Sequence, residues 1–70
     1  MKGKMNVHYD NKGDFLEISI GNPTKCVAEE IKPGIFIRMD EKNKEVKSVS
    51  ILNFKKRINS PKDIEILLPV

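Results

Sequence analysis

The chain contains few of the residues from which small domains build covalent or metal cross-links. Among its 70 residues there is one Cys, Cys26, and one His, His8, and there is no Trp. A single Cys excludes an intrachain disulfide, and the lack of a His/Cys cluster argues against a structural zinc site. A chain this short buries only about 60% of the surface that its unfolded form exposes. Self-association is the remaining way to bury more surface, and we therefore expect a homodimer.

Long apolar runs are also lacking. No stretch approaches the roughly 18 apolar residues of a membrane span. The opening residues, MKGKMNVHYD, lack the apolar core of a signal peptide. Together with the single Cys, these features favour a reducing compartment. We therefore expect a cytoplasmic protein without a membrane partner.

The charge balance is only slightly basic. Lys and Arg number 13 against 10 Asp and Glu, and the net excess of +3 lies in residues 36–70. So small an excess is weak support for a nucleic-acid partner, and no helix-turn-helix, zinc or RNA-binding signature is present. The one basic cluster is Lys55-Lys56-Arg57. It fits a solvated helix face or a contact for an acidic partner, and alternatively a phosphate-contacting patch.

Two stretches of the chain are alike. Val7–Ile20 reads VHYDNKGDFLEISI, and Ile37–Ile51 reads IRMDEKNKEVKSVSI. Each consists of an alternating apolar run, an Asp, a polar turn and a second alternating run. Alternation with period two indicates strands. The repeat therefore predicts two antiparallel hairpins within a single domain, residues 1–70.

Matching the apolar faces sets the register of the first hairpin. An even-numbered loop places Tyr9 opposite Leu16 and Val7 opposite Ile18, whereas an odd-numbered loop places polar residues opposite apolar ones. A slip of one residue exchanges the faces of a strand, so the apolar match selects the even loop. The loop then centres on Lys12-Gly13, and we expect Gly13 to supply a positive φ.

The second hairpin follows the same rule with one interruption. Met39 falls opposite Val46 across a loop centred on Lys42-Asn43, with Asn43 expected at the left-handed position. Beyond Val46 the apolar phase breaks, because the next apolar residue, Val49, is three positions away. One extra residue at Lys47-Ser48 restores the match, placing Ile37 opposite Val49 and Ile35 opposite Ile51. This pattern predicts a β-bulge.

A third strand is expected over residues 25–31, before the turn Lys32-Pro33-Gly34-Ile35. Pro at the second position and Gly at the third are typical of a type II turn. The turn would make this strand the antiparallel neighbour of residues 35–40 and place Glu29 near Arg38 as an exposed cross-strand pair.

The end of the chain is less regular. Phe54 and Ile58 are four residues apart, which predicts a short helix over residues 53–59. The following segment, residues 60–70, fits a helix beginning at Ser60-Pro61 and equally a strand of alternating apolar residues; we favour the strand. The expected fold is therefore mainly β (a small α+β domain): an antiparallel sheet of two hairpins joined by the Pro-Gly turn, with one short helix and a C-terminal strand.

Apolar residues are expected on both faces of this sheet. Phe15 and Phe36 lie opposite the alternating aliphatic side chains, and the Pro-Gly register places Val27 and Ile31 with them. Such a sheet needs a cover on both faces. The C-terminal segment supplies one, and a second copy of the chain would supply the other. The apolar tail invites pairing with another chain, so the predicted dimer interface comprises Ile64, Ile66, Leu67 and Leu68.

A set of strand and turn residues forms a pattern along the chain: Tyr9, Asp10, Asp14, Leu16, Ile18, Gly34, Ile35, Asp40 and Val49–Asn53. In this pattern the chain resembles a known family, the small prokaryotic domain of unknown function 2283 (DUF2283). The resemblance covers about Val7–Arg57. Ser48 stands where the family often has Gly, and Ser50 where it often has Glu. Members encoded beside small toxin-like proteins imply an antitoxin or partner-binding role.

No residue pattern predicts catalysis. His8 has no Ser or Cys partner on its strand face and is expected to be solvated. Carboxylates at the loop ends (Asp10, Asp14, Asp40 and Glu41) have the chemistry to bind Mg²⁺ or Ca²⁺, but an Asp that begins a turn normally bonds its own backbone. Cys26 is expected to be a small half-buried residue. We expect neither a catalytic nor a metal site, and no cofactor.

These observations favour a non-catalytic protein-interaction module, by resemblance an antitoxin-like partner of a small toxin. The alternative is a nucleic-acid-binding protein that uses Lys55, Lys56 and Arg57.

Overall fold

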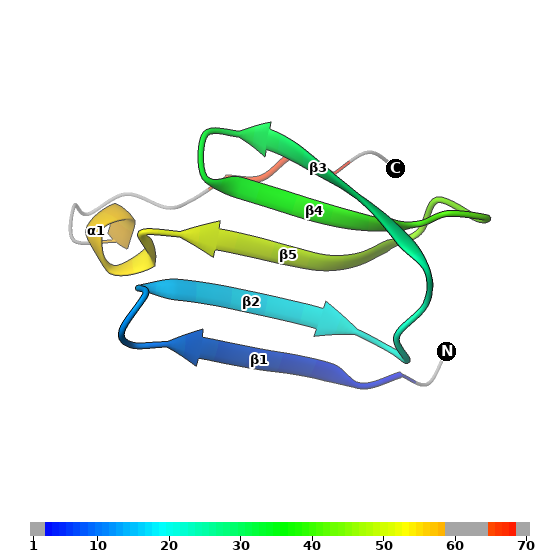
Figure 1. Ribbon diagram of the computed structural model, residues 1–70, viewed down its shortest axis with the longest axis horizontal. Helices are drawn as coiled ribbons and strands as arrows, with labels where there is room; N and C mark the ends of the chain where they lie inside the picture. Colours follow the sequence, from blue (N-terminus) through cyan, green and yellow to red (C-terminus); the bar gives the residue numbers. More distant parts are fainter. Residues whose placement is uncertain (1–2, 59–64, 69–70) are drawn as a thin grey trace.

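The computed structural model describes residues 3–58 and 65–68. They form one five-stranded antiparallel sheet in the order β1-β2-β5-β4-β3, with a short helix at one end (Figure 1). The fold is thus mainly β, as the sequence predicts. The strands are β1 (Met5–Asp10), β2 (Phe15–Ile20), β3 (Cys26–Lys32), β4 (Ile35–Asp40) and β5 (Val46–Leu52), and the helix is α1 (Phe54–Ile58).

The register of the first hairpin is confirmed. Tyr9 pairs with Leu16 and Val7 with Ile18 across a loop of residues 11–14. The predicted positive φ at Gly13 is wrong, because the left-handed residue is Asp14, with a φ of 51°. A four-residue loop is most often built around a type I turn, whose central residues keep negative φ. In this loop the last residue, Asp14, adopts the left-handed conformation, which Asp tolerates.

The second hairpin also has the predicted register and bulge. Ile37 pairs with Val49 and Met39 with Val46, and the register shifts by one residue between Arg38 and Met39. Lys47 is the extra residue. The left-handed residue of this loop is Lys44, with a φ of 63°, and not Asn43. The Asn43 side chain instead accepts a hydrogen bond from Glu45 N at 2.9 Å.

The two hairpins join through their inner strands, β2 and β5. Leu16 pairs with Ile51 and Ile18 with Val49, so the apolar residues of both hairpins share one face. The connection after β2 therefore has to cross to the opposite edge of the sheet to begin β3, as Figure 1 shows. Gly21 begins this connection with a φ of 70°.

The Pro33-Gly34 turn forms as predicted, with a φ of 80° at Gly34. The register of β3 with β4 differs from the prediction. A bulge between Glu30 and Lys32 makes Ile31 the extra residue. The slip places Ala28 opposite Arg38 and Glu29 opposite Ile37. The predicted Glu29–Arg38 pair is therefore wrong.

The same slip changes the faces assigned to β3. Val27 pairs with Met39, and directly paired residues share a face. Val27 therefore lies with the aliphatic residues, and its predicted place beside the Phe residues is wrong. Ile31 lies in the bulge rather than in a regular pair.

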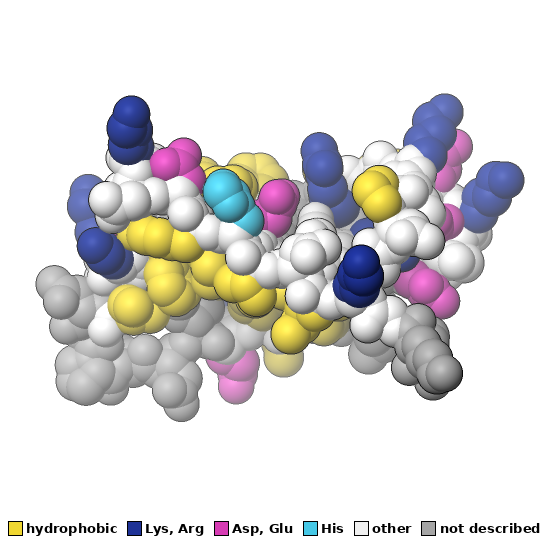
Figure 2. All heavy atoms as spheres, turned by 90° about the horizontal axis from the view of Figure 1, so that it is seen from below, with side chains coloured by type: hydrophobic (Ala, Val, Ile, Leu, Met, Phe, Trp, Pro, Cys, Tyr) yellow, Lys and Arg dark blue, Asp and Glu magenta, His cyan; other side chains and the backbone are white. Residues whose placement is uncertain are grey.

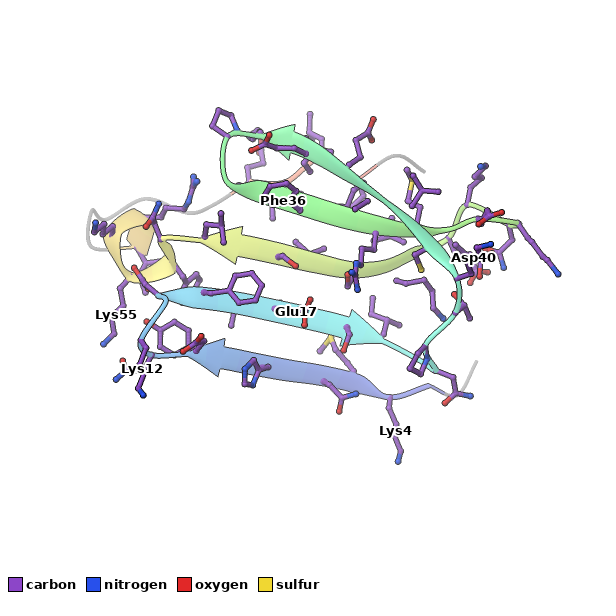
Figure 3. The ribbon with its side chains drawn as sticks, viewed as in Figure 1. Lys4, Lys12, Glu17, Phe36, Asp40 and Lys55 are labelled. Atoms are coloured by element: carbon purple, nitrogen blue, oxygen red, sulfur yellow. The ribbon has the colours of Figure 1, made fainter. Side chains whose placement is uncertain are left out.

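We call the two sides of the sheet the aliphatic face and the phenylalanine face. The aliphatic face holds the core: Ile37 is fully buried and Ile35 and Ile51 nearly so. The phenylalanine face is turned toward the viewer in Figure 3, where Glu17 and Phe36 are labelled. The aliphatic face carries Val7, Tyr9, Leu16, Ile18, Ile35, Ile37, Val49 and Ile51, and the phenylalanine face carries Phe15, Glu17, Phe36, Arg38, Ser48, Ser50 and Leu52.

The helix α1 confirms the predicted short helix. Its first residue, Phe54, packs edge-on against Tyr9, with ring centroids 6.0 Å apart. Residues 65–68 form no strand, so the predicted C-terminal strand is wrong over these residues; the rest of that segment lies outside the described residues. A side-chain hydrogen bond links these residues to β3, since Lys32 Nζ donates to Glu65 O at 2.9 Å.

Candidate binding surface on the phenylalanine face

Three central strands bring the phenylalanine face together. Cross-strand pairing sets Glu17 of β2 beside Ser50 of β5, and Ser50 beside Phe36 of β4. The next row along the strands pairs Phe15 with Leu52. Residues far apart in the sequence thus form one continuous surface, because the inner strands of the two hairpins are hydrogen-bonded neighbours.

An open hollow of about 280 Å³ lies on this surface, and we call it the phenylalanine hollow. Phe15 and Phe36 are half-buried, and Leu52 is 37% exposed. Ser50 Oγ donates to Glu17 Oε2 at 3.3 Å and so fixes one carboxylate oxygen at the rim. Apolar and polar groups therefore both line the hollow, with Ser50 lying between Glu17 and Phe36. Its lining residues are Phe15, Glu17, Ala28, Phe36, Arg38, Ser50 and Leu52.

A second, more polar hollow of about 220 Å³ adjoins it, and Glu17 and Arg38 line both. Ser48 also lines the second hollow and is 95% buried, since its exposed fraction is 5%. Within the described part of the chain, Ser48 Oγ has no hydrogen-bond partner. A buried hydroxyl without a partner costs free energy.

The predicted basic cluster divides into two parts. Lys55 and Lys56 are exposed, and Lys55 Nζ lies 6.0 Å from the centre of the Tyr9 ring. Arg57 is half-buried: its Nε donates to Leu52 O at 2.8 Å and its Nη2 to Pro33 O at 2.5 Å. The guanidinium therefore clamps the helix to the Pro-Gly turn. Nothing in the sequence pattern indicated this structural role.

The loop carboxylates behave as turn residues. Asp10 Oδ1 accepts from the backbone N–H groups of Lys12 and Gly13, and Asp40 Oδ1 accepts from those of Lys42 and Asn43. The prediction that Asp10 and Asp40 form turns is thus confirmed. The Asn43 N–H, and next the Thr24 side chain, lower the pKa of Asp40 below its ordinary value.

Asp14 has a different role, which the sequence analysis missed. Its Oδ1 accepts a hydrogen bond from Lys55 N at 2.7 Å and another from Tyr9 Oη at 2.8 Å. The carboxylate therefore caps the N-terminus of α1 from another part of the chain. The Lys55 N–H is the main cause that lowers the pKa of Asp14, and hydrogen bonding to Asp14 raises the pKa of Tyr9.

The remaining candidate residues lie apart from one another. His8 is exposed and pairs across the strands with Glu17. Cys26 is half-buried, with Sγ 3.6 Å from Thr24 Oγ1. Among residues 3–58 and 65–68 no group of three or more His, Cys, Asp or Glu side chains is arranged to hold a metal ion, and no helix there is long and apolar enough to cross a membrane.

The predicted dimer-interface residues lie in the tail. Ile66 is half-buried, Leu67 is 75% exposed and Leu68 is 44% exposed. Ile64 lies outside the described residues.

Comparison with protein families matches residues 6–55 to the model described as "Protein of unknown function (DUF2283)". The chain belongs to the DUF2283 family. The match covers all the residues that line the phenylalanine hollow and ends at Lys55, within α1. No curated protein and no solved structure matches the chain. Membership of DUF2283 states a family but no activity.

Proposed function

We propose that this DUF2283 protein is a non-catalytic protein-interaction module that binds its partner through the phenylalanine face. The observation that carries the proposal is the phenylalanine hollow itself. Phe15, Phe36 and Leu52 leave part of their apolar surface open on a face whose other side chains are largely polar. Aromatic residues in an accessible apolar patch with a polar rim are typical of protein interfaces.

The rim defines the chemistry of the partner. Glu17 and Arg38 carry opposite charges and both border the hollow. The matching partner is a protein segment that inserts one apolar side chain between Phe15 and Phe36 and presents a hydrogen-bond acceptor toward Arg38.

The shape of the hollow suits the side chain of a partner. It is an open depression on the sheet surface rather than an enclosed cavity. The exposed position of His8 gives it no enclosed cavity in which to act as a general base.

An antitoxin-like role is the more specific form of the proposal and rests on the family resemblance. In this form the partner is a small toxin-like protein. Co-expression of the chain would then relieve growth arrest caused by that protein. Replacement of Phe36 by Ser would abolish the relief, and continued protection by the variant would contradict this form.

The direct test is capture from the native host with matched variants. Tagged wild-type chain, Phe36→Ser and the control Val27→Ser would be compared, because Val27 is 53% exposed and lies on the other face. A protein captured by wild type would then be purified and titrated against all three chains by calorimetry. We expect binding to be lost with Phe36→Ser and kept with Val27→Ser. Recovery of the isolated chain alone, or equal loss with both variants, would count against the proposal.

Nucleic-acid binding through Lys55–Arg57 has weaker support. Two hydrogen bonds to backbone carbonyls occupy the Arg57 guanidinium, which leaves Lys55 and Lys56 as exposed charges, with Lys12 toward the same end of the sheet (Figure 3). Salt-dependent retention of DNA or RNA that falls with Lys55→Ala/Lys56→Ala would favour it. Unchanged retention would exclude this cluster as the site.

A further inference from the structure

The strand β1 forms one edge of the sheet, and no other strand of the described residues pairs with its outer main-chain groups. Gly21 N donates to Lys4 O at 2.6 Å, so the Lys4 carbonyl points toward β2. Main-chain groups alternate in direction along an antiparallel strand. Even-numbered residues of β1 therefore bond to β2, whereas the N–H and C=O groups of Met5, Val7 and Tyr9 point to the outer flank.

This edge differs from the other one. β3 has a bulge at Ile31, two consecutive Glu residues and Pro33 directly after it. Bulges, charges and Pro are the usual features that keep an edge strand from pairing with another chain. β1 pairs with β2 over its whole length without a register shift, and it carries neither Pro nor a bulge.

The flank of β1 is also apolar. Met5 is 67% exposed and Val7 is 62% exposed. Figure 2, seen from the β1 side of the sheet, shows apolar side chains in a row along this flank. Regular, open and apolar edge strands are those that associate.

We propose that β1 pairs antiparallel with β1 of a second copy of this chain, about a two-fold axis at Val7. In this register Val7 faces its own counterpart, and Met5 faces Tyr9 of the second copy. All the outward N–H and C=O groups of β1 then form hydrogen bonds with the second copy. The two aliphatic faces become continuous, since residues paired directly across strands share a face.

Charge complementarity selects this register among the alternatives. With the axis at Val7, Lys4 of each copy lies opposite Asp10 of the other. A shift that centres the pair on His8 places the two His8 side chains against each other, and a shift to Asn6 places Lys4 opposite His8. A slip of one residue would match outward groups with groups already bonded to β2. Figure 3 shows Lys4 extending away from the sheet at this flank.

This interface is separate from the phenylalanine hollow, so it stands independently of the proposed function. It also differs from the dimer interface predicted at the tail. A dimer built on β1 would leave the phenylalanine face of each copy open to another partner.

Sedimentation at micromolar concentration tests the dimer. We expect about twice the chain mass of 8.0 kDa for wild type and for the control Val7→Thr, which keeps the N–H group. Val7→Pro removes an outward N–H, a position where an edge strand tolerates Pro, and should be monomeric with an unchanged circular dichroism spectrum. A monomeric wild type, or a dimer that persists in Val7→Pro, would overturn the inference. So would a dimer lost on Leu67→Ser instead.

Charge reversal at Lys4 keeps the strand intact and tests the register. Lys4→Glu faces Asp10 of the second copy and should weaken the dimer roughly tenfold, because opposed like charges replace two attractive pairs. Lys42→Glu, in the loop between β4 and β5 and away from β1, should leave the dimer unchanged. Equal weakening by both variants would show a general charge effect and contradict the register.

Cross-linking in a Cys26→Ser background gives an independent readout. Paired residues at the axis have Cα atoms about 5.5 Å apart, within the range of a disulfide. Val7→Cys should therefore form a covalent dimer on mild oxidation, and Met5→Cys, which faces Tyr9 rather than itself, should not. The reverse outcome, or equal yields, would overturn the proposed axis.

Discussion

Tyr9 Oη donates a hydrogen bond to Asp14 Oδ1 at 2.8 Å, and the same oxygen caps the first turn of α1 through Lys55 N. One carboxylate thus ties the first hairpin to the helix. Phe54 packs on the Tyr9 ring next to this bond. Because Asp14 has a positive φ, the geometry of the loop is part of what aims the carboxylate at the helix.

Asp14 should make the free energy of unfolding depend on pH in the acid range. Its pKa is lowered in the folded state from 3.8, so its contribution is fully present above about 3.8 and is lost as the pH falls through the lowered value. Urea unfolding of wild type and Asp14→Asn at a series of pH values should show a difference in unfolding free energy that shrinks in acid. Asp40 titrates in the same direction, so the variant should keep a smaller acid dependence. Parallel curves for the two chains would refute the role of Asp14.

Tyr9 should titrate above its ordinary range. Its pKa is raised from 10.0, which means that its contribution to stability is full below 10.0 and is lost as the pH rises through the folded value. Tyr9 is the only Tyr and there is no Trp, so ultraviolet absorbance of the phenolate reports this residue alone. The midpoint should lie above 10.0 and move down in Asp14→Asn. A midpoint at or below 10.0 in the folded wild type would contradict the hydrogen bond.

Gly34 should resist substitution. Its φ is 80°, and a Cβ there would meet the Arg57 guanidinium that clamps the turn. The left-handed conformation alone costs a non-Gly residue about 1–2 kcal/mol, so Gly34→Ala should lower the unfolding free energy by at least that amount. Gly3→Ala is the control, because nothing lies within 4 Å of a Cβ at that position. Equal stability of the two variants would show that the clamp and the turn are dispensable.

Ile37 should be the residue whose truncation costs most in the core. It has an exposed fraction of 0%, and Ile→Ala changes in cores cost about 2–5 kcal/mol. Val27→Ala, at a site that is 53% exposed, should cost less than about 0.5 kcal/mol, as surface changes usually do. Denaturant midpoints of the two variants give the comparison. A small loss for Ile37→Ala would mean that the aliphatic face is not the core.

The hairpin registers could be predicted because apolar and polar residues alternate regularly along these strands. Val46 and Val49 break that alternation, and the break located the bulge of β5. β3 reads CVAEEIK, which has no clear alternation, so its bulge at Ile31 left no signal. The consequence was the wrong partner for Arg38.

The binding surface could be predicted only in part. The sequence placed Phe15 and Phe36 together on the face opposite the core, which is where they lie. Their neighbours depend on the pairing of β2 with β5, which no local pattern specifies. The cap by Asp14 likewise joins residues 41 positions apart. It depends on the positive φ of Asp14, whereas the loop sequence predicted the positive φ at Gly13.

The central claim is that the phenylalanine face binds a protein partner. Its most direct test is nuclear magnetic resonance of the isotopically labelled chain, titrated with the partner captured from the native host. The account predicts that the largest amide shifts cluster at Phe15, Phe36, Arg38 and Leu52, and that they vanish in Phe36→Ser. Shifts confined to the tail, to Lys55 and Lys56 or to the β1 edge, with the phenylalanine face unchanged, would contradict it.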